Sequence, residues 1–118
     1  MTKSRSEIGR SSRRKGKVGE REIVNALKAA GFEAAHRSAQ YCGNTGDAPD
    51  VEGLPGIHIE VKRVERLNLR KAYEQAVNDS KKNGDIPAVF HRQSRQPWMV
   101  TVSLYDFLKI CEGGIHNE

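Results

Sequence analysis

Two carboxylates and a lysine, Asp50, Glu60 and Lys62, occur at a spacing that suits the hydrolysis of a phosphate ester. The run from Ile57 to Lys62 alternates apolar and polar residues, which predicts a β-strand with Glu60 and Lys62 on one face. A neighbouring strand that contributed Asp50 would complete an acidic pocket that contains one cation. Mg²⁺ prefers oxygen ligands and promotes the attack of water on phosphodiesters. These residues therefore indicate metal-assisted phosphodiester hydrolysis.

The sequence between Asp50 and Glu60 restricts how their strands can pair. The run Gly53-Leu54-Pro55-Gly56 is typical of a turn and predicts a hairpin. Asp50 lies opposite Glu60 only if the numbers of paired positions sum to 110, which requires an odd loop centred on Pro55. Gly56 must then be free to adopt a positive φ. A two-residue loop would place the carboxylates on opposite faces, so the predicted site depends on this register.

Two helices are predicted to bring further polar side chains to the site. The pattern from Lys17 to Ala30 is helical, and Glu20 lies beside its apolar stripe, whereas Glu22 belongs to the solvent face. A first-turn carboxylate that the helix dipole favours is the alternative interpretation of Glu20. Gln75, at the edge of the apolar stripe of a second helix, would orient a water molecule or a phosphate.

The residues around Glu60 have simpler interpretations as well. The Val61 carbonyl would give the metal a third oxygen, and Lys62 would orient or deprotonate the attacking water or offset charge in the transition state. His58 shares the face of Glu60, and we interpret it as a neighbour rather than a ligand. A Glu-x-Lys run is common on solvated strands, and an Asp after Pro often belongs to a turn. No single residue therefore establishes the predicted site, and the prediction depends on all of these residues occurring together.

The order of predicted elements is helix, three strands, helix, two strands, helix, which indicates an α/β domain with a mixed central sheet of about five strands. Ser103 followed by Asp106 resembles a capping box at the start of the last helix. The predicted elements are Lys17–Ala30, Phe32–Arg37, Asp50–Val51, Ile57–Lys62, Leu69–Asn83, Ile86–His91, Trp98–Ser103 and Leu104–Cys111.

Positive charge is concentrated at the N-terminus of the chain. The 118 residues carry a net charge of +5, yet residues 1–17 hold seven basic residues against Glu7 alone. We expect a flexible basic arm over residues 1–13, a single nuclease domain over 14–111 and a frayed tail over 112–118. A solubilising tail is the alternative to phosphate contact. The candidate DNA-binding residues are Arg10, Arg13, Arg14, Lys15, Lys17, Arg37 and Ser38.

Membrane and secreted classes are not indicated. The sequence has no apolar run of about 18 residues and no secretory h-region at its N-terminus. Cys42 and Cys111 form no spaced metal motif, so we expect free thiols in a reducing cytoplasm. The expected location is the cytoplasm of a prokaryotic cell or of a phage-infected host.

Pro49-Asp50 followed by Glu60-Val61-Lys62 resembles the signature of the PD-(D/E)xK nuclease superfamily. Within it the chain looks most like the archaeal-type Holliday junction resolvases and their phage relatives, over roughly residues 14–103. This closer resemblance is carried by Lys15-Gly16-Lys17-Val18-Gly19-Glu20-Arg21-Glu22, by Gly31-Phe32-Glu33 leading into Arg37-Ser38, and by a helix with Tyr73 and Gln75.

The resemblance implies a restriction-endonuclease-like core in which Glu20, Asp50, Glu60 and Lys62 are catalytic. It also implies Mg²⁺, with Mn²⁺ as a substitute, bound by the acids. Homodimers whose paired active sites nick two strands of a four-way DNA junction are a further implication. The loop over residues 38–47 is longer than this pattern leads us to expect, and its Asp47 competes with Asp50 for the motif position.

Two other functions are compatible with these residues. One is a repair or restriction nuclease of the same superfamily, although 118 residues leave little room for a base-reading module. The other is a non-catalytic DNA-binding module on the same fold. Clustered acids would repel phosphate in such a module unless a cation screened them, which favours the enzyme.

Overall fold

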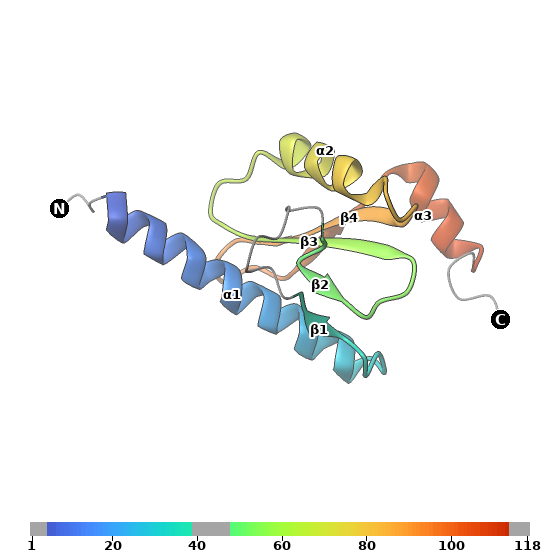
Figure 1. Ribbon diagram of the computed structural model, residues 1–118, viewed down its shortest axis with the longest axis horizontal. Coiled ribbons are helices and arrows are strands. Elements are labelled where there is room, and N and C mark those ends of the chain that lie inside the picture. Colours follow the sequence, from blue (N-terminus) through green and yellow to red (C-terminus); the bar gives the residue numbers. More distant parts are fainter. Residues whose placement is uncertain (1–4, 39–47, 114–118) are drawn as a thin grey trace.

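The computed structural model describes residues 5–38 and 48–113, and for residues 5–15 it describes the helical backbone without the side chains. Five strands form one sheet in the order β1-β2-β3-β4-β5, and three helices flank it (Figure 1). The elements are α1 Arg5–Ala29, β1 His36–Arg37, β2 Val51–Glu52, β3 Ile57–Arg63, α2 Leu69–Ser80, β4 Ile86–Arg92, β5 Met99–Thr101 and α3 Leu104–Cys111.

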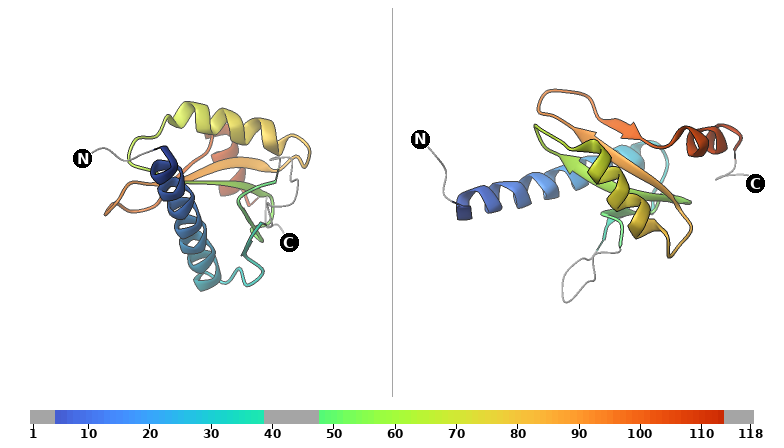
Figure 2. Two further views of the ribbon diagram at one scale, coloured as in Figure 1. Left: turned by 60° about the vertical axis from the view of Figure 1, so that its left-hand side comes forward. Right: turned by 90° about the horizontal axis from the view of Figure 1, so that it is seen from above.

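The sheet is mixed, because β3 and β4 pair in parallel while the other neighbouring strands pair antiparallel. The parallel pair requires a crossover connection, and α2 provides it. Figure 2 shows α1 and α2 on opposite faces of the sheet, with α3 beyond the β5 edge. The predicted α/β architecture with about five strands is therefore confirmed.

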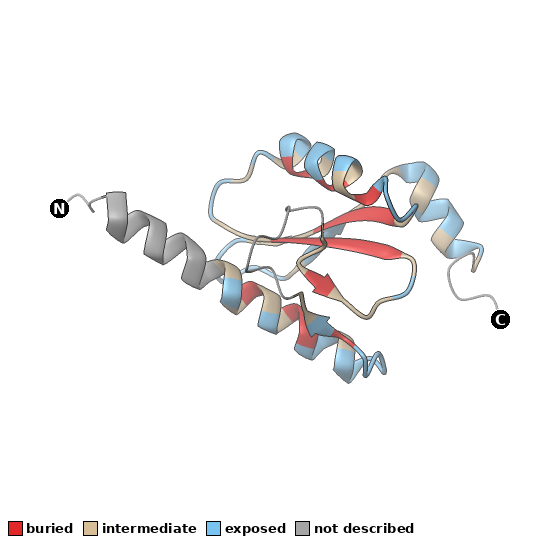
Figure 3. Ribbon diagram, viewed as in Figure 1, coloured by how far each residue is buried: buried red, intermediate tan, exposed pale blue. Residues whose placement is uncertain are grey.

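Both faces of the central strand are buried (Figure 3). On the α1 face, Ile23 and Val24 pack with Val51, Ile59 and other apolar side chains of the sheet. On the α2 face, a smaller cluster joins Ala72 and Ala76 of α2 to Val89 of β4. Since a helix covers each face, the polar positions of β3, His58 and Glu60, are buried as fully as the apolar ones.

Several predicted boundaries were wrong. Helix α1 begins at Arg5 rather than at Lys17, so residues 5–13, expected as an arm, are helical. Arg and Lys are good helix formers, but a search for apolar periodicity does not detect them. The first strand is limited to His36–Arg37. Helix α2 ends at Ser80 and β5 spans only Met99–Thr101.

Other local predictions were confirmed. Helix α3 spans the predicted residues, and the side chain of its N-cap Ser103 accepts a hydrogen bond from the Asp106 backbone N–H at 3.0 Å. Cys111 is a free, exposed thiol, whereas Cys42 lies outside the described residues. Within the described part of the chain, no helix is long and apolar enough to cross a membrane.

Candidate active site

The β2–β3 hairpin has the register that the predicted site requires. Val51 pairs with Ile59, so Asp50 and Glu60 are the next residues along the two strands. The turn between them contains Gly53 and Gly56, which adopt φ of 104° and 80°. Gly53 is fixed by packing as well, because a Cβ there would lie 2.5 Å from the Ala34 carbonyl oxygen. The glycine-flanked turn therefore sets the register that brings the two carboxylates together.

Asp50 is the most perturbed carboxyl group of the site. Its Oδ2 accepts a hydrogen bond from the Val61 backbone N–H at 2.7 Å, which holds the side chain across β3. Burial, and then the negative charge of Glu60, raise the pKa of Asp50 to about 6. The Val61 hydrogen bond opposes this rise, the charge of Glu20 adds to it and Lys62 opposes it. The charges of Glu60, Glu20 and Lys62 therefore all act on Asp50. These four residues are the ones that the resemblance to the resolvases predicted to be catalytic.

Glu60 lies deeper than Asp50, with 4% of its surface exposed. Its Oε1 is 3.2 Å from Nε2 of His58, which is fully buried on the same face of β3. The sequence left two interpretations of the polar face of β3, a metal site or a face exposed to solvent. The burial of His58 and Glu60 excludes a solvent-exposed face at these positions. Charged side chains are buried only when they have partners.

Glu20 is half-buried on α1 and accepts a hydrogen bond from Arg37 Nε at 2.9 Å. The helix approaches the sheet closely at the preceding residue, where a Cβ on Gly19 would lie 3.1 Å from Arg63 Cβ. This close packing carries Glu20 to the edge of the Asp50 and Glu60 cluster. Because Arg37 is paired with Glu20, it is not a simple surface contact for phosphate.

The donor atoms of the cluster fit a hard divalent cation. Asp50, Glu60 and Glu20 supply carboxylate oxygens, while Lys62 supplies a positive charge that lowers the pKa of Asp50. Burial first, and then the charges of Glu60 and Glu20, disfavour the ionised form of Asp50. Mg²⁺ and Mn²⁺ take oxygen ligands of this kind and would balance the charge.

Not every predicted site residue joins this cluster. Gln75 is exposed on α2, and among the described residues no hydrogen bond or ion pair connects it with Asp50 or Glu60. The Ser38 hydroxyl donates to the Pro49 carbonyl and so fixes the chain next to Asp50. Lys17 is exposed on α1, and Asp47 lies outside the described residues. The side chains of Arg10, Arg13, Arg14 and Lys15 also lie outside the described part.

Glu22 was predicted to face solvent, and this prediction was wrong. Its Oε1 accepts hydrogen bonds from Arg92 Nη1 at 2.8 Å and from Trp98 Nε1 at 3.0 Å. Arg63 Nε lies 3.7 Å from the same oxygen. One carboxylate of α1 is therefore held by groups from β3, β4 and the residue before β5.

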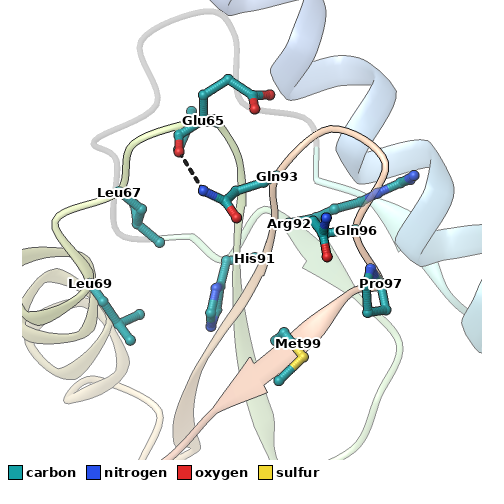
Figure 4. A pocket seen from close by; sticks show the side chains of 10 residues that line it. Glu65, Leu67, Leu69, His91, Arg92, Gln93, Gln96, Pro97 and Met99 are labelled. Carbon is teal, nitrogen blue, oxygen red and sulfur yellow. Dashed lines mark hydrogen bonds between the residues drawn. The ribbon is translucent and has the colours of Figure 1, made fainter.

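A separate pocket of about 340 Å³ opens between the β3–α2 connection and the β4–β5 hairpin (Figure 4). His91 and Met99 line it, and Gln93 Nε2 closes one side by donating to the Glu65 carbonyl at 2.8 Å. None of the predicted catalytic residues lines this pocket. The candidate catalytic residues therefore lie away from this pocket.

The sequence interpretation missed Asp79. A ligand atom from each of His58, Glu60 and Asp79 lies within 4.8 Å of the other two. Asp79 follows Ala72 by seven residues and Ala76 by three, a spacing that places it on the sheet-facing side of α2. Helical periodicity therefore contained the signal that would have identified it.

Comparisons with known proteins agree with this geometry. The family described as archaeal Holliday junction resolvase (Hjc) matches residues 11–103. Among solved structures, Hjc of Archaeoglobus fulgidus, a Holliday junction resolvase from an archaeal hyperthermophile, is similar with a TM-score of 0.57 and 28% identity. The match covers 73% of this chain and 75% of that one, and it confirms the restriction-endonuclease-like core. No curated protein sequence matches the chain.

Proposed function

Because the chain belongs to the archaeal Holliday junction resolvase family, we propose that it is a Mg²⁺-dependent endonuclease that resolves four-way DNA junctions as a homodimer. The observation that carries the proposal is the hairpin register, which sets Asp50 beside Glu60 with the charges of Glu20 and Lys62 acting on the same cluster. This arrangement is the one that phosphodiester hydrolysis requires.

Asp50, Glu60 and the Val61 carbonyl would hold Mg²⁺, with Glu20 as a further carboxylate. When bound, the cation would supply charge neutralisation at the phosphoryl oxygens and help to activate water. Hydrolysis forms a bond between the water oxygen and phosphorus, breaks the bond to the leaving sugar oxygen and transfers a proton to that oxygen. Lys62, half-buried on the face of Glu60, offsets the negative charge that develops on the phosphoryl group.

Two residues would position this machinery. Arg37, paired with Glu20, fixes the orientation of the helix carboxylate and presents its remaining guanidinium donors to a phosphate. The Ser38 hydroxyl holds the segment that leads to Asp50. We retain Gln75 as a candidate for contact with substrate, since its exposed side chain can reach a DNA backbone bound over α2.

The basic part of α1 would bind the phosphate backbone. Positions 10, 13, 14 and 17 belong to the same continuous helix, and all four are Arg or Lys. A helix rich in Arg and Lys can bind a row of phosphates. The same helix carries Glu20, so DNA contact and catalysis would be linked through one rigid element.

A second copy of the chain would dock on the β5–α3 surface, defined as Met99, Val100, Leu104, Tyr105, Phe107 and Leu108. These side chains are between 49% and 72% exposed, β5 is an edge strand and α3 has no buried residue. Large apolar side chains exposed together on adjacent elements are typical of a protein–protein contact.

The partner at this surface is a second copy because resolution of a four-way junction requires two symmetric cuts. The described residues of one chain contain one Asp50–Glu60 cluster. A two-fold pair would present two such clusters to the two strands.

The test is nicking of a synthetic four-way junction in the presence of Mg²⁺. We expect the wild-type protein to produce paired nicks, and the Glu60→Ala and Lys62→Ala variants to bind the junction without cutting it. Binding without cleavage by the wild type in both Mg²⁺ and Mn²⁺ would refute the enzymatic function. Equal cleavage of the junction and of plain duplex would instead indicate a nuclease without selectivity for branched DNA.

A further inference from the structure

His58, Glu60 and Asp79 form a compact group between β3 and α2. A ring nitrogen of His58 and one oxygen from each carboxylate lie within 4.8 Å of one another. His58 and Glu60 are buried on the α2-facing side of the strand, and Asp79 is half-buried on the helix above them. The group therefore spans the interface between a central strand and the crossover helix.

The imidazole of His58 provides a second and independent observation. The side chain is fully buried, with 0% of its surface exposed. Nε2 is 3.2 Å from Glu60 Oε1, whereas Nδ1 has no hydrogen-bond partner among the described residues. A buried ring nitrogen without a partner is costly, so its presence here requires a reason. One ring nitrogen of His58 lies within 4.8 Å of an oxygen of each carboxylate, so a cation bound among them would gain an imidazole ligand.

We propose that His58, Glu60 and Asp79 bind a divalent transition-metal ion at a site distinct from the proposed Mg²⁺ site. One imidazole and two carboxylates suit Zn²⁺ or Co²⁺, whereas Mg²⁺ and Ca²⁺ prefer oxygen ligands alone. Glu60 belongs to both ligand sets, and Asp79 and His58 belong only to this one. The ion ties α2 to β3, so its binding stabilises the folded chain.

The site is tested by titrating the full-length protein with Co²⁺ in the absence of Mg²⁺, because Mg²⁺ at the oxygen site would compete for Glu60. Visible absorption follows binding, and equilibrium dialysis counts the ions. We expect one Co²⁺ per chain, no thiolate-to-metal charge-transfer band and a higher melting temperature. Absence of Co²⁺ binding under these conditions refutes the site.

Variants identify the ligands. Asp79→Asn should weaken Co²⁺ binding more than about tenfold, a loss at least as large as that seen for outer-sphere partners of metal sites. Asp50→Asn, which removes a ligand of the oxygen site alone, should still bind Co²⁺. Glu74→Gln, which neutralises an exposed carboxylate on the same helix, should leave Co²⁺ affinity unchanged. Wild-type affinity in Asp79→Asn overturns the assignment. Junction nicking in Mg²⁺ alone is measured in parallel, so failure of this site and failure of the proposed function are distinguished.

A measurement on the wild-type protein tests the ligand set even if the variants fail to fold. X-ray absorption of the Zn²⁺-loaded wild type should show one imidazole and no sulfur among the ligands. A spectrum without imidazole, or one with sulfur, contradicts the proposed ligand set.

Discussion

Replacing Asp50 by Asn should stabilise the metal-free protein at neutral pH while it abolishes Mg²⁺-dependent cleavage. The pKa of Asp50 is about 6 in the folded chain against an ordinary value of 3.8. A rise of about two units, at about 1.4 kcal/mol per unit, means that ionised Asp50 costs the folded state up to about 3 kcal/mol. Asn removes the charge, and its amide oxygen can still accept the Val61 N–H hydrogen bond.

The sign of this effect sets its pH dependence. Because the folded state holds the Asp50 proton more tightly than the unfolded state, the wild type loses stability as pH rises from 3.8 to about 6. The variant lacks this loss. The difference in the free energy of unfolding between variant and wild type should therefore be small below pH 3.8 and reach its full size above about pH 6.

Urea denaturation across this pH range, without metal and with excess Mg²⁺, measures the difference. Mg²⁺ should stabilise the wild type and have little effect on Asp50→Asn, because the cation balances the charge that Asn lacks. Glu74→Gln, which neutralises an exposed carboxylate, is the control and should change little in either condition. A variant less stable than the wild type at neutral pH, or a difference independent of pH, would refute the electrostatic reasoning.

Three further predictions concern helix α1 and the dimer. Among the described atoms none lies within 4 Å of a Cβ added to Gly16, so Gly16→Ala should stabilise the protein by about 0.5–1 kcal/mol. Gly19→Ala, whose Cβ would meet Arg63 and Val61, should be less stable than Gly16→Ala by at least about 1 kcal/mol in urea melts, and equal stability would exclude close packing at Gly19. Changing Arg10, Arg13 and Arg14 together to Gln should weaken the salt dependence of junction binding. The slope of the logarithm of the binding constant against the logarithm of the salt concentration should become smaller in magnitude by up to about 2.7, and an unchanged slope would indicate that these residues only increase solubility. Leu104→Glu with Tyr105→Glu should convert a dimer into monomers in analytical ultracentrifugation, whereas Lys81→Glu, an exposed residue just after α2, should not. A wild-type protein that is monomeric at all concentrations would contradict the proposed interface.

The proximity of Asp50 to Glu60 could be predicted from the sequence because its determinants are local. The alternation of β3, the glycine pair in the turn and the short separation of Asp50 from Glu60 together define a register that either joins or separates the carboxylates. The positive φ of Gly56 was required by that register and is present. A short hairpin turn allows only a few loop lengths, each with its own strand register, so the alternatives can be worked out from the sequence.

Other features could not be predicted because tertiary packing determines them. Glu22 has the sequence position of a solvent-facing helix residue, but Arg92 of β4 and Trp98, just before β5, approach it from far along the chain. The burial of His58 follows from α2 covering the second face of the sheet, which alternation in β3 alone does not reveal. Helix α1 extends to Arg5 through basic residues that lack the apolar spacing used to detect helices.

The hairpin that carries Asp50 and Glu60 has a consequence for the order of folding events. Its two strands are joined by one short turn, so closing it costs little chain entropy. The parallel pairing of β3 with β4 and the docking of α1 both close longer loops and are slower for that reason. We therefore expect the two acids to meet before Glu20 reaches them. The folding chain would then bring two carboxylates together before the helix that completes the site is in place.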